Sequence, residues 1–236
     1  MRPININPND LSYIFWKKIL DHSFLKQNTI IDNFFLKIDG LDKLRKNSDH
    51  NTGSITSTTA WLLYALTFYF QPKLILEVGS FIGKSTFSMA LAAENYDEDN
   101  HVEIHCCDHS NEIIFPKISK TKIFQYHKTS STDMMKLIDK DKIFNFIHLD
   151  GRLQNNDYGL IMRRLDENSI FIFDDFEGGE KGVANFLNLL TNKIVSWSSY
   201  CLVYPINDKV AEKYRLVEPS NTAILLPIKY LKVSRQ

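Results

Sequence analysis

The sequence has little of what marks secreted, membrane-spanning or nucleic-acid-binding chains. Only three of its 236 residues are cysteine, and Cys106, Cys107 and Cys201 lack the paired C-x-x-C spacing of a zinc site. Its 28 basic and 28 acidic residues leave no net charge, which argues against a general nucleic-acid binder. The longest apolar run, residues 60–70, is too short to span a bilayer. We therefore expect a cytoplasmic protein with no nucleic-acid and no membrane partner.

The chain is nevertheless rich enough in apolar residues to form a sizeable core. A hydrophobic fraction of 44% over 236 residues suits one large α/β domain or two small ones. Residues 1–55 differ from the rest, because apolar residues recur there at helical spacing before a polar, loop-like stretch at 46–53. We interpret 1–55 as an N-terminal helical extension, either a lid over a site or the arm of a homodimer. Helices that simply cover the core are an equal alternative.

Residues 56–236 alternate between short apolar runs and helix-length segments. The runs typical of strands are 74–78, 102–107, 122–126, 144–149, 169–173, 199–204 and 222–227. Such alternation predicts a Rossmann-like α/β domain with a seven-stranded, mostly parallel sheet and helices on both faces. The last two runs have only the short segment 208–213 between them, so we expect an antiparallel edge strand there.

A glycine-bearing turn follows the first expected strand, in the run Glu77-Val78-Gly79-Ser80-Phe81-Ile82-Gly83-Lys84-Ser85. Ligands of such sheets bind at the carboxyl ends of the strands, near the point where the strand order reverses. Gly79 and Gly83 allow the backbone to approach a ligand closely, and the following helix points free N–H groups at the same space. The turn therefore predicts a ligand site.

Two nucleotide-binding motifs fit this turn poorly. A P-loop, G-x-x-x-x-G-K-[ST], shares Gly83-Lys84-Ser85, but Gly79 leaves the loop one residue short. Glu77 would also place a negative charge near the phosphates. The dinucleotide fingerprint G-x-G-x-x-G fits less well still. A P-loop-like nucleotide hydrolase, with Asp150 as its Mg²⁺ acid, stays open as an alternative.

The same turn resembles motif I of class I S-adenosylmethionine-dependent methyltransferases, E-x-G-x-x-x-G-x-S after a strand. Over residues 76–86 it is similar to the catechol/caffeoyl-CoA O-methyltransferases and their bacterial sugar and macrolide relatives. The resemblance implies S-adenosyl-L-methionine as cofactor, and a carboxylate suits its sulfonium. It implies that the methionine portion is lined by Glu77, Gly79, Ser80, Gly83 and Ser85, with Phe81 as a wall of the site.

The resemblance assigns two further residues to the cofactor. Asp108 ends the second expected strand, 25 residues after Gly83, where an acid that binds the ribose hydroxyls is expected. Ser131 lies in the loop after the third strand, where the family carries a residue near the adenine.

Carboxylates follow the fourth and fifth expected strands. Asp150 comes after the fourth, and Asp174 and Asp175 come after the fifth, with no cluster of Lys or Arg evident beside them. Three acids at one sheet edge would repel one another, and a hard divalent cation resolves that conflict. The resemblance implies that these acids bind Mg²⁺, which would hold and activate a substrate hydroxyl. It also places Asp150 next to the cofactor and in the catalytic site.

Arg152 stands where the resembled family leads us to expect a His or Lys base. Arginine stays protonated and is a poor base, so we expect Arg152 to bind an anionic group of the substrate. The resemblance thus implies an enzyme that moves a methyl group to a hydroxyl of a small molecule with Mg²⁺ assistance. A protein that binds S-adenosylmethionine without transferring its methyl group is the remaining alternative.

Overall fold

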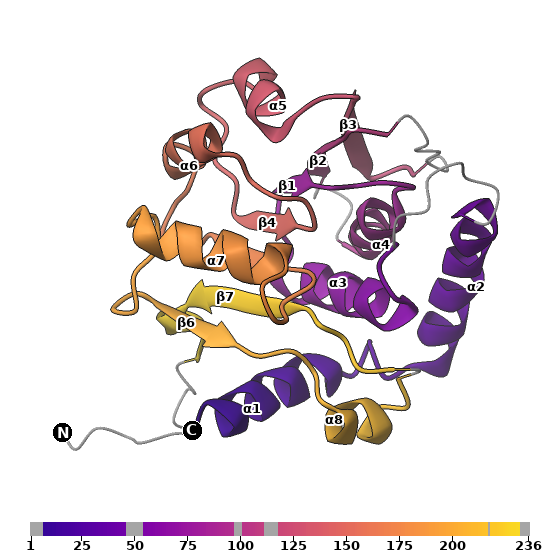
Figure 1. Cartoon of the computed structure of the whole chain (residues 1–236). Helices are drawn as coiled ribbons and strands as arrows, with labels where there is room; N and C mark the ends of the chain where they lie inside the picture. Colours follow the sequence, from indigo (N-terminus) through magenta and orange to yellow (C-terminus); the bar gives the residue numbers. More distant parts are fainter. Residues whose placement is uncertain (1–6, 46–53, 97–100, 111–117, 217, 232–236) are drawn as a thin grey trace.

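A computed structural model describes residues 7–45, 54–96, 101–110, 118–216 and 218–231. The strands are β1 (Leu74–Val78), β2 (Val102–Asp108), β3 (Thr121–His127), β4 (Phe146–Leu149), β5 (Ile170–Phe173), β6 (Tyr200–Val203) and β7 (Ala223–Pro227). The helices are α1 (Pro8–Leu20), α2 (Asn28–Arg45), α3 (Ser57–Phe70), α4 (Lys84–Ala93), α5 (Ser131–Leu137), α6 (Asn155–Met162), α7 (Lys181–Thr191), α8 (Asp208–Lys213) and the 3₁₀ helix η1 (Ile228–Leu231). Figure 1 shows how they surround one sheet.

The seven strands form a single sheet in the order β3-β2-β1-β4-β5-β7-β6. Every pairing from β3 to β5 is parallel, whereas β7 is antiparallel to both β5 and β6. The predicted Rossmann-like sheet with an antiparallel edge is therefore confirmed, and β7 lies one place in from that edge. From β1, the chain first adds β2 and β3 on one side and then β4 and β5 on the other. Ligands of such sheets bind at the carboxyl ends of the strands where the order changes direction, here β1 and β4.

Alternation along the strands divides the core into two layers. Ile75 of β1 belongs to the apolar cluster beneath α1, α2, α3, α4 and α8, whereas its neighbour Leu76 belongs to the cluster beneath α5, α6 and α7. In β5, Ile170 and Ile172 face the first cluster, and Phe171 and Phe173 face the second. Helices cover both faces of the sheet, as Figure 1 shows. Successive residues of a strand such as β5 are therefore all apolar, rather than alternately apolar and polar.

The first two helices belong to the core. Phe15, Trp16 and Ile19 of α1, together with Phe34 and Ile38 of α2, are buried in the cluster that α3 also fills. The indole Nε1 of Trp16 donates to the carbonyl oxygen of Tyr204 at 2.9 Å. Both helices thus cover the core, and their use as a lid or a homodimer arm stays a prediction.

Capping residues set the start of two helices. Helix α5 was not expected, and its start is capped by Ser130, whose hydroxyl accepts the backbone N–H of Asp133 at 3.1 Å. Helix α3 begins at Ser57, because Thr56 caps it by accepting the N–H of Thr59 at 3.0 Å. Within the described ranges no helix is long and apolar enough to cross a membrane.

Candidate active site

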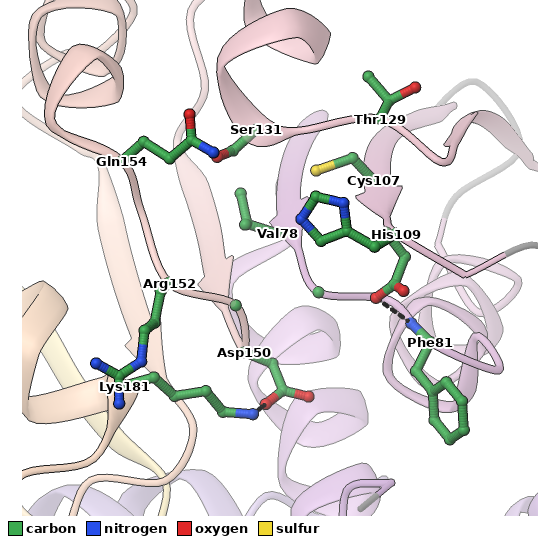
Figure 2. Close-up of a pocket in the computed structure, with 13 residues that line it drawn as sticks. Val78, Phe81, Cys107, His109, Thr129, Ser131, Asp150, Arg152, Gln154 and Lys181 are labelled. Atoms are coloured by element: carbon green, nitrogen blue, oxygen red, sulfur yellow. Dashed lines mark hydrogen bonds and ion pairs between the residues drawn. The ribbon is translucent and has the colours of Figure 1, made fainter. Parts of the chain in front are cut away.

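A cleft of about 300 Å³ lies at the carboxyl ends of β1, β2 and β4. Figure 2 shows its walls: Val78 and Cys107 from the strand ends, Asp150 and Arg152 after β4, and Lys181 from the start of α7. Its position is the point where the strand order reverses, at which ligands of open α/β sheets bind.

Gly79 allows the loops after β1 and β4 to meet at the floor of the cleft. Its φ is +90°, and a Cβ there would lie 2.6 Å from the backbone nitrogen of Gly151. The carbonyl oxygen of Val78 accepts the N–H groups of Asp150 at 2.9 Å and of Gly151 at 2.7 Å. Because no side chain fits at position 79, these loops pack backbone to backbone and the space above them stays open for a ligand.

Asp108 is held in place at the end of β2. Its Oδ2 accepts the N–H of Phe81 and its Oδ1 accepts the N–H of Ser110, both at 2.8 Å. An ionised carboxylate has about four lone-pair sites, so each oxygen can accept a further hydrogen bond. Asp108 lines the cleft and can therefore receive hydroxyl donors from a ligand.

The structure brings only part of the predicted cofactor set to the cleft. Gly79, Phe81, Asp108, Ser131 and Asp150 line it. The hydroxyl of Ser131 itself donates to Oδ2 of Asp157 at 2.5 Å. The predicted residues that do not line the cleft are buried beneath the turn or in α4; they are Glu77, Ser80, Gly83 and Ser85.

Glu77 points away from the cleft, into the layer beneath α3 and α4. Its Oε1 lies 3.0 Å from Nδ1 of His148, and its Oε2 accepts the hydroxyl of Thr86. Burial alone would lower the pKa of His148, but the hydrogen bond and charge of Glu77, helped by the charges of Asp150 and Asp174, raise it. Both oxygens of Glu77 are therefore engaged inside the fold, away from the space where we expected it to meet the cofactor.

The predicted metal site is not formed by the residues assigned to it. Nζ of Lys181 lies 2.6 Å from Oδ1 of Asp150 and 3.1 Å from Oδ2 of Asp175, so one lysine, although no cluster of Lys or Arg, stands beside these acids. Asp174 is buried, and its Oδ1 accepts the hydroxyl of Thr222 at 2.9 Å. No group of three or more His, Cys, Asp or Glu side chains in the described part of the chain could hold a metal ion. With the ammonium of Lys181 in contact with both Asp150 and Asp175, the donor set does not fit Mg²⁺.

Charges at this edge of the sheet are strongly coupled. Burial raises the pKa of the Asp150 carboxyl to about 7, and the charge of Asp174 adds to the rise while Lys181 opposes it. Burial also raises the pKa of Asp174, against the opposing charge of His148 and the hydrogen bond from Thr222. Burial alone would lower the pKa of Lys181, but the charge of Asp150 and the hydrogen bonds to Asp150 and Asp175 raise it.

Lys181 is a charged residue of the cleft that the sequence analysis missed. It is the first residue of α7, where the helix dipole disfavours a positive charge. A lysine at that position, six residues after Asp175 in a glycine-rich run, was a usable signal for a nearby acidic partner. Arg152, by contrast, lies where expected: it is exposed and lines the cleft beside Lys181 (Figure 2).

Lys84 does not act as the lysine of a P-loop. Its side chain is buried, and its Nζ lies 3.3 Å from the hydroxyl oxygen of Ser57 in α3. The cleft is lined by other residues, whereas a P-loop lysine reaches the phosphates of the nucleotide. The position of the Lys84 side chain therefore argues against a P-loop-like nucleotide hydrolase.

The sheet order, the glycine turn after β1 and the acid after β2 together define the class of fold: it is the Rossmann-like methyltransferase fold. Residues 76–176 match the family model described as "Methyltransferase domain". No curated protein sequence matches the chain.

Solved structures have the same fold at low sequence identity. An O-methyltransferase of Bacillus cereus is similar with a TM-score of 0.55 and 14% identity, covering 89% of this chain and 95% of that one. The O-methyltransferase TomG of Streptomyces achromogenes has a TM-score of 0.55 and 12% identity, covering 80% and 88%. A methyltransferase of Geobacter sulfurreducens has a TM-score of 0.51 and 12% identity, covering 83% and 88%.

Proposed function

We propose that the protein transfers the methyl group of S-adenosylmethionine to a hydroxyl of a small molecule. The observation that carries this proposal is the cleft itself, which has the cofactor acid Asp108 on one side and the polar residues Asp150, Arg152 and Lys181 on the other. The names of the Bacillus cereus and TomG structures, both O-methyltransferases, support oxygen as the acceptor atom.

The residues present suit the cofactor. Asp108 can receive the ribose hydroxyls, Phe81 offers an apolar wall, and Gly79 leaves the backbone of the turn open to the methionine portion. S-adenosylmethionine supplies an electrophilic methyl group on a positively charged sulfur. The opposite side of the cleft is then left for the acceptor.

Asp150 and Arg152 have separate tasks in the proposed reaction. The acceptor oxygen forms a bond to the methyl carbon as the bond from that carbon to sulfur breaks, and the electron pair stays on sulfur. Asp150, which lines the cleft, receives the hydroxyl proton. Arg152 stays charged and binds an anionic group of the acceptor, so its role is to hold the substrate. The proposed reaction uses no Mg²⁺, because Lys181 already contacts Asp150 and Asp175.

The proposal is tested in two stages. Isothermal titration calorimetry with S-adenosylhomocysteine is expected to show one binding site, whereas ATP is expected to show none. Incubation of the enzyme with methyl-labelled S-adenosylmethionine and a panel of hydroxylated acids should then transfer label to at least one acceptor. Cofactor binding without transfer to any hydroxyl, amine or thiol acceptor would favour the non-transferring alternative. A homodimer and a cytoplasmic location stay predictions of the sequence.

A further inference from the structure

The ammonium of Lys181 joins the two strand ends that a metal ion was expected to join. It lies within 3.1 Å of both Asp150, directly after β4, and Asp175, just past β5. The contact with Asp150 faces the cleft in Figure 2. A single positive charge therefore bridges Asp150 and Asp175 and offsets part of the negative charge at this edge of the sheet.

The close packing of Gly182 on the end of β5 holds Lys181 in this position. The next residue, Gly182, packs so closely on the end of β5 that a Cβ there would lie 2.2 Å from the carbonyl oxygen of Asp174. The same Cβ would lie 2.9 Å from the carbonyl oxygen of Asp175. Any other residue at 182 would push the start of α7 away from the acids. Glycine at 182 thus fixes the distance between Lys181 and the two carboxylates.

Without its acidic partners, a charged Lys181 side chain would be energetically unfavourable at this position. The first turn of a helix carries a partial positive charge, which repels an ammonium group. The side chain is also only 27% exposed, so it has lost part of its hydration. The two carboxylates offset both costs, which distinguishes Lys181 from a solvated surface lysine.

We propose that Lys181 takes the place of the divalent cation in this enzyme and binds the oxygen of the acceptor directly. An ammonium group has three N–H donors, and Asp150 and Asp175 accept two of them. Because Lys181 lines the cleft, the third donor can reach an acceptor oxygen there. This inference rests on the proposed function, and it assigns to a side chain the charge that Mg²⁺ was expected to supply.

The test uses Mn²⁺ as a probe, because its binding is read without methyl transfer. Electron paramagnetic resonance of Mn²⁺ mixed with the wild-type protein is expected to show the unbound ion only. In Lys181→Ala the carboxylates lose their cation, and we expect the variant to bind about one Mn²⁺ per chain. Lys181→Arg keeps the positive charge and is the matched control, with no Mn²⁺ bound. Lys181→Ala combined with Asp150→Asn is expected to lose the ion again.

Two results would overturn the proposal. One is Mn²⁺ binding by the wild-type protein that disappears in Asp150→Asn, since the lysine would then yield the site to a metal. The other is a folded Lys181→Ala variant that binds no Mn²⁺. If that variant does not fold, Lys181→Gln, of similar length and without charge, is measured instead. Calorimetry with S-adenosylhomocysteine on the wild-type protein and on Lys181→Arg tests the proposed function separately, because both keep Asp150 and the positive charge beside it.

Discussion

Glu77 and His148 form a pair with no exposed side-chain surface, in which Oε1 of Glu77 lies 3.0 Å from Nδ1 of His148. The two residues are directly opposite each other in the register of β1 and β4. These are the strands between which the order of the sheet reverses, so the pair ties together the floor of the active-site cleft.

Replacing Glu77 with alanine should destabilise the protein more than it affects the cofactor. Removing one member of a buried pair leaves the other unsatisfied, and we expect the free energy of unfolding to fall by about 3–5 kcal/mol. Urea denaturation measures the loss. Glu167→Ala is the control, since Glu167 pairs with Lys229 at an exposed position and should cost only about 0–1 kcal/mol. A stable Glu77→Ala protein with weak S-adenosylhomocysteine binding would instead show that Glu77 meets the cofactor.

Replacing Asp108 with alanine should weaken cofactor binding. The carboxylate orients the Phe81 loop and lines the cleft, and hydrogen bonds to a charged group contribute about 1.5–3 kcal/mol. Calorimetry with S-adenosylhomocysteine should therefore show a loss of that size. Glu212→Ala, at an exposed position in α8, should bind as the wild type does. Equal affinity of the Asp108 variant and the wild type would remove Asp108 from the cofactor site.

Gly79→Ala and Gly159→Ala should have opposite effects on stability. At position 79, φ is +90° and a Cβ meets the backbone of Gly151, so alanine should cost roughly 1–3 kcal/mol and lower cofactor affinity. At position 159, inside α6, nothing lies within 4 Å of the added Cβ, and alanine should stabilise the protein by about 0.5–1 kcal/mol. Thermal and urea unfolding compare the two. A tolerated Gly79→Ala would contradict the close packing of the two loops.

His105 should make the protein less stable in acid. Its ring stacks on Phe124 with centroids 4.5 Å apart, and burial lowers its pKa against the opposing hydrogen bond of Glu103. The unfolded chain takes up a proton near pH 6.5, whereas the folded protein resists it, so stability is lost as the pH falls below about 6.5. His105→Phe removes this uptake. Urea unfolding at pH 7.5 and 5.5 should show that the variant loses less stability than the wild type on acidification; parallel losses would exclude the effect.

Local patterns in the sequence were sufficient to predict the sheet. The run 74–78 is predicted as a strand and is β1. The alternating Ile and Phe residues of 170–173 form β5, whose two faces pack against the two apolar clusters. These predictions succeed because strand formation and burial depend on residues that are near in the sequence. The positions of Asp108 and Asp150 at strand ends follow from the same local signal, since parallel strands bring their carboxyl ends to one edge.

What the sequence could not decide is which side chains meet across that edge. Glu77 lies in the motif that resembles a cofactor turn, yet the direction of its side chain follows from the face of β1 that α3 and α4 cover. Likewise, the three acids suggested a metal until the packing of α7 on the end of β5 placed Lys181 between Asp150 and Asp175. Both outcomes depend on contacts between elements far apart in the chain, and local periodicity carries no information about such contacts. The sequence by itself determined the sheet and its binding edge, whereas only the tertiary structure decided the charge at the centre of the site.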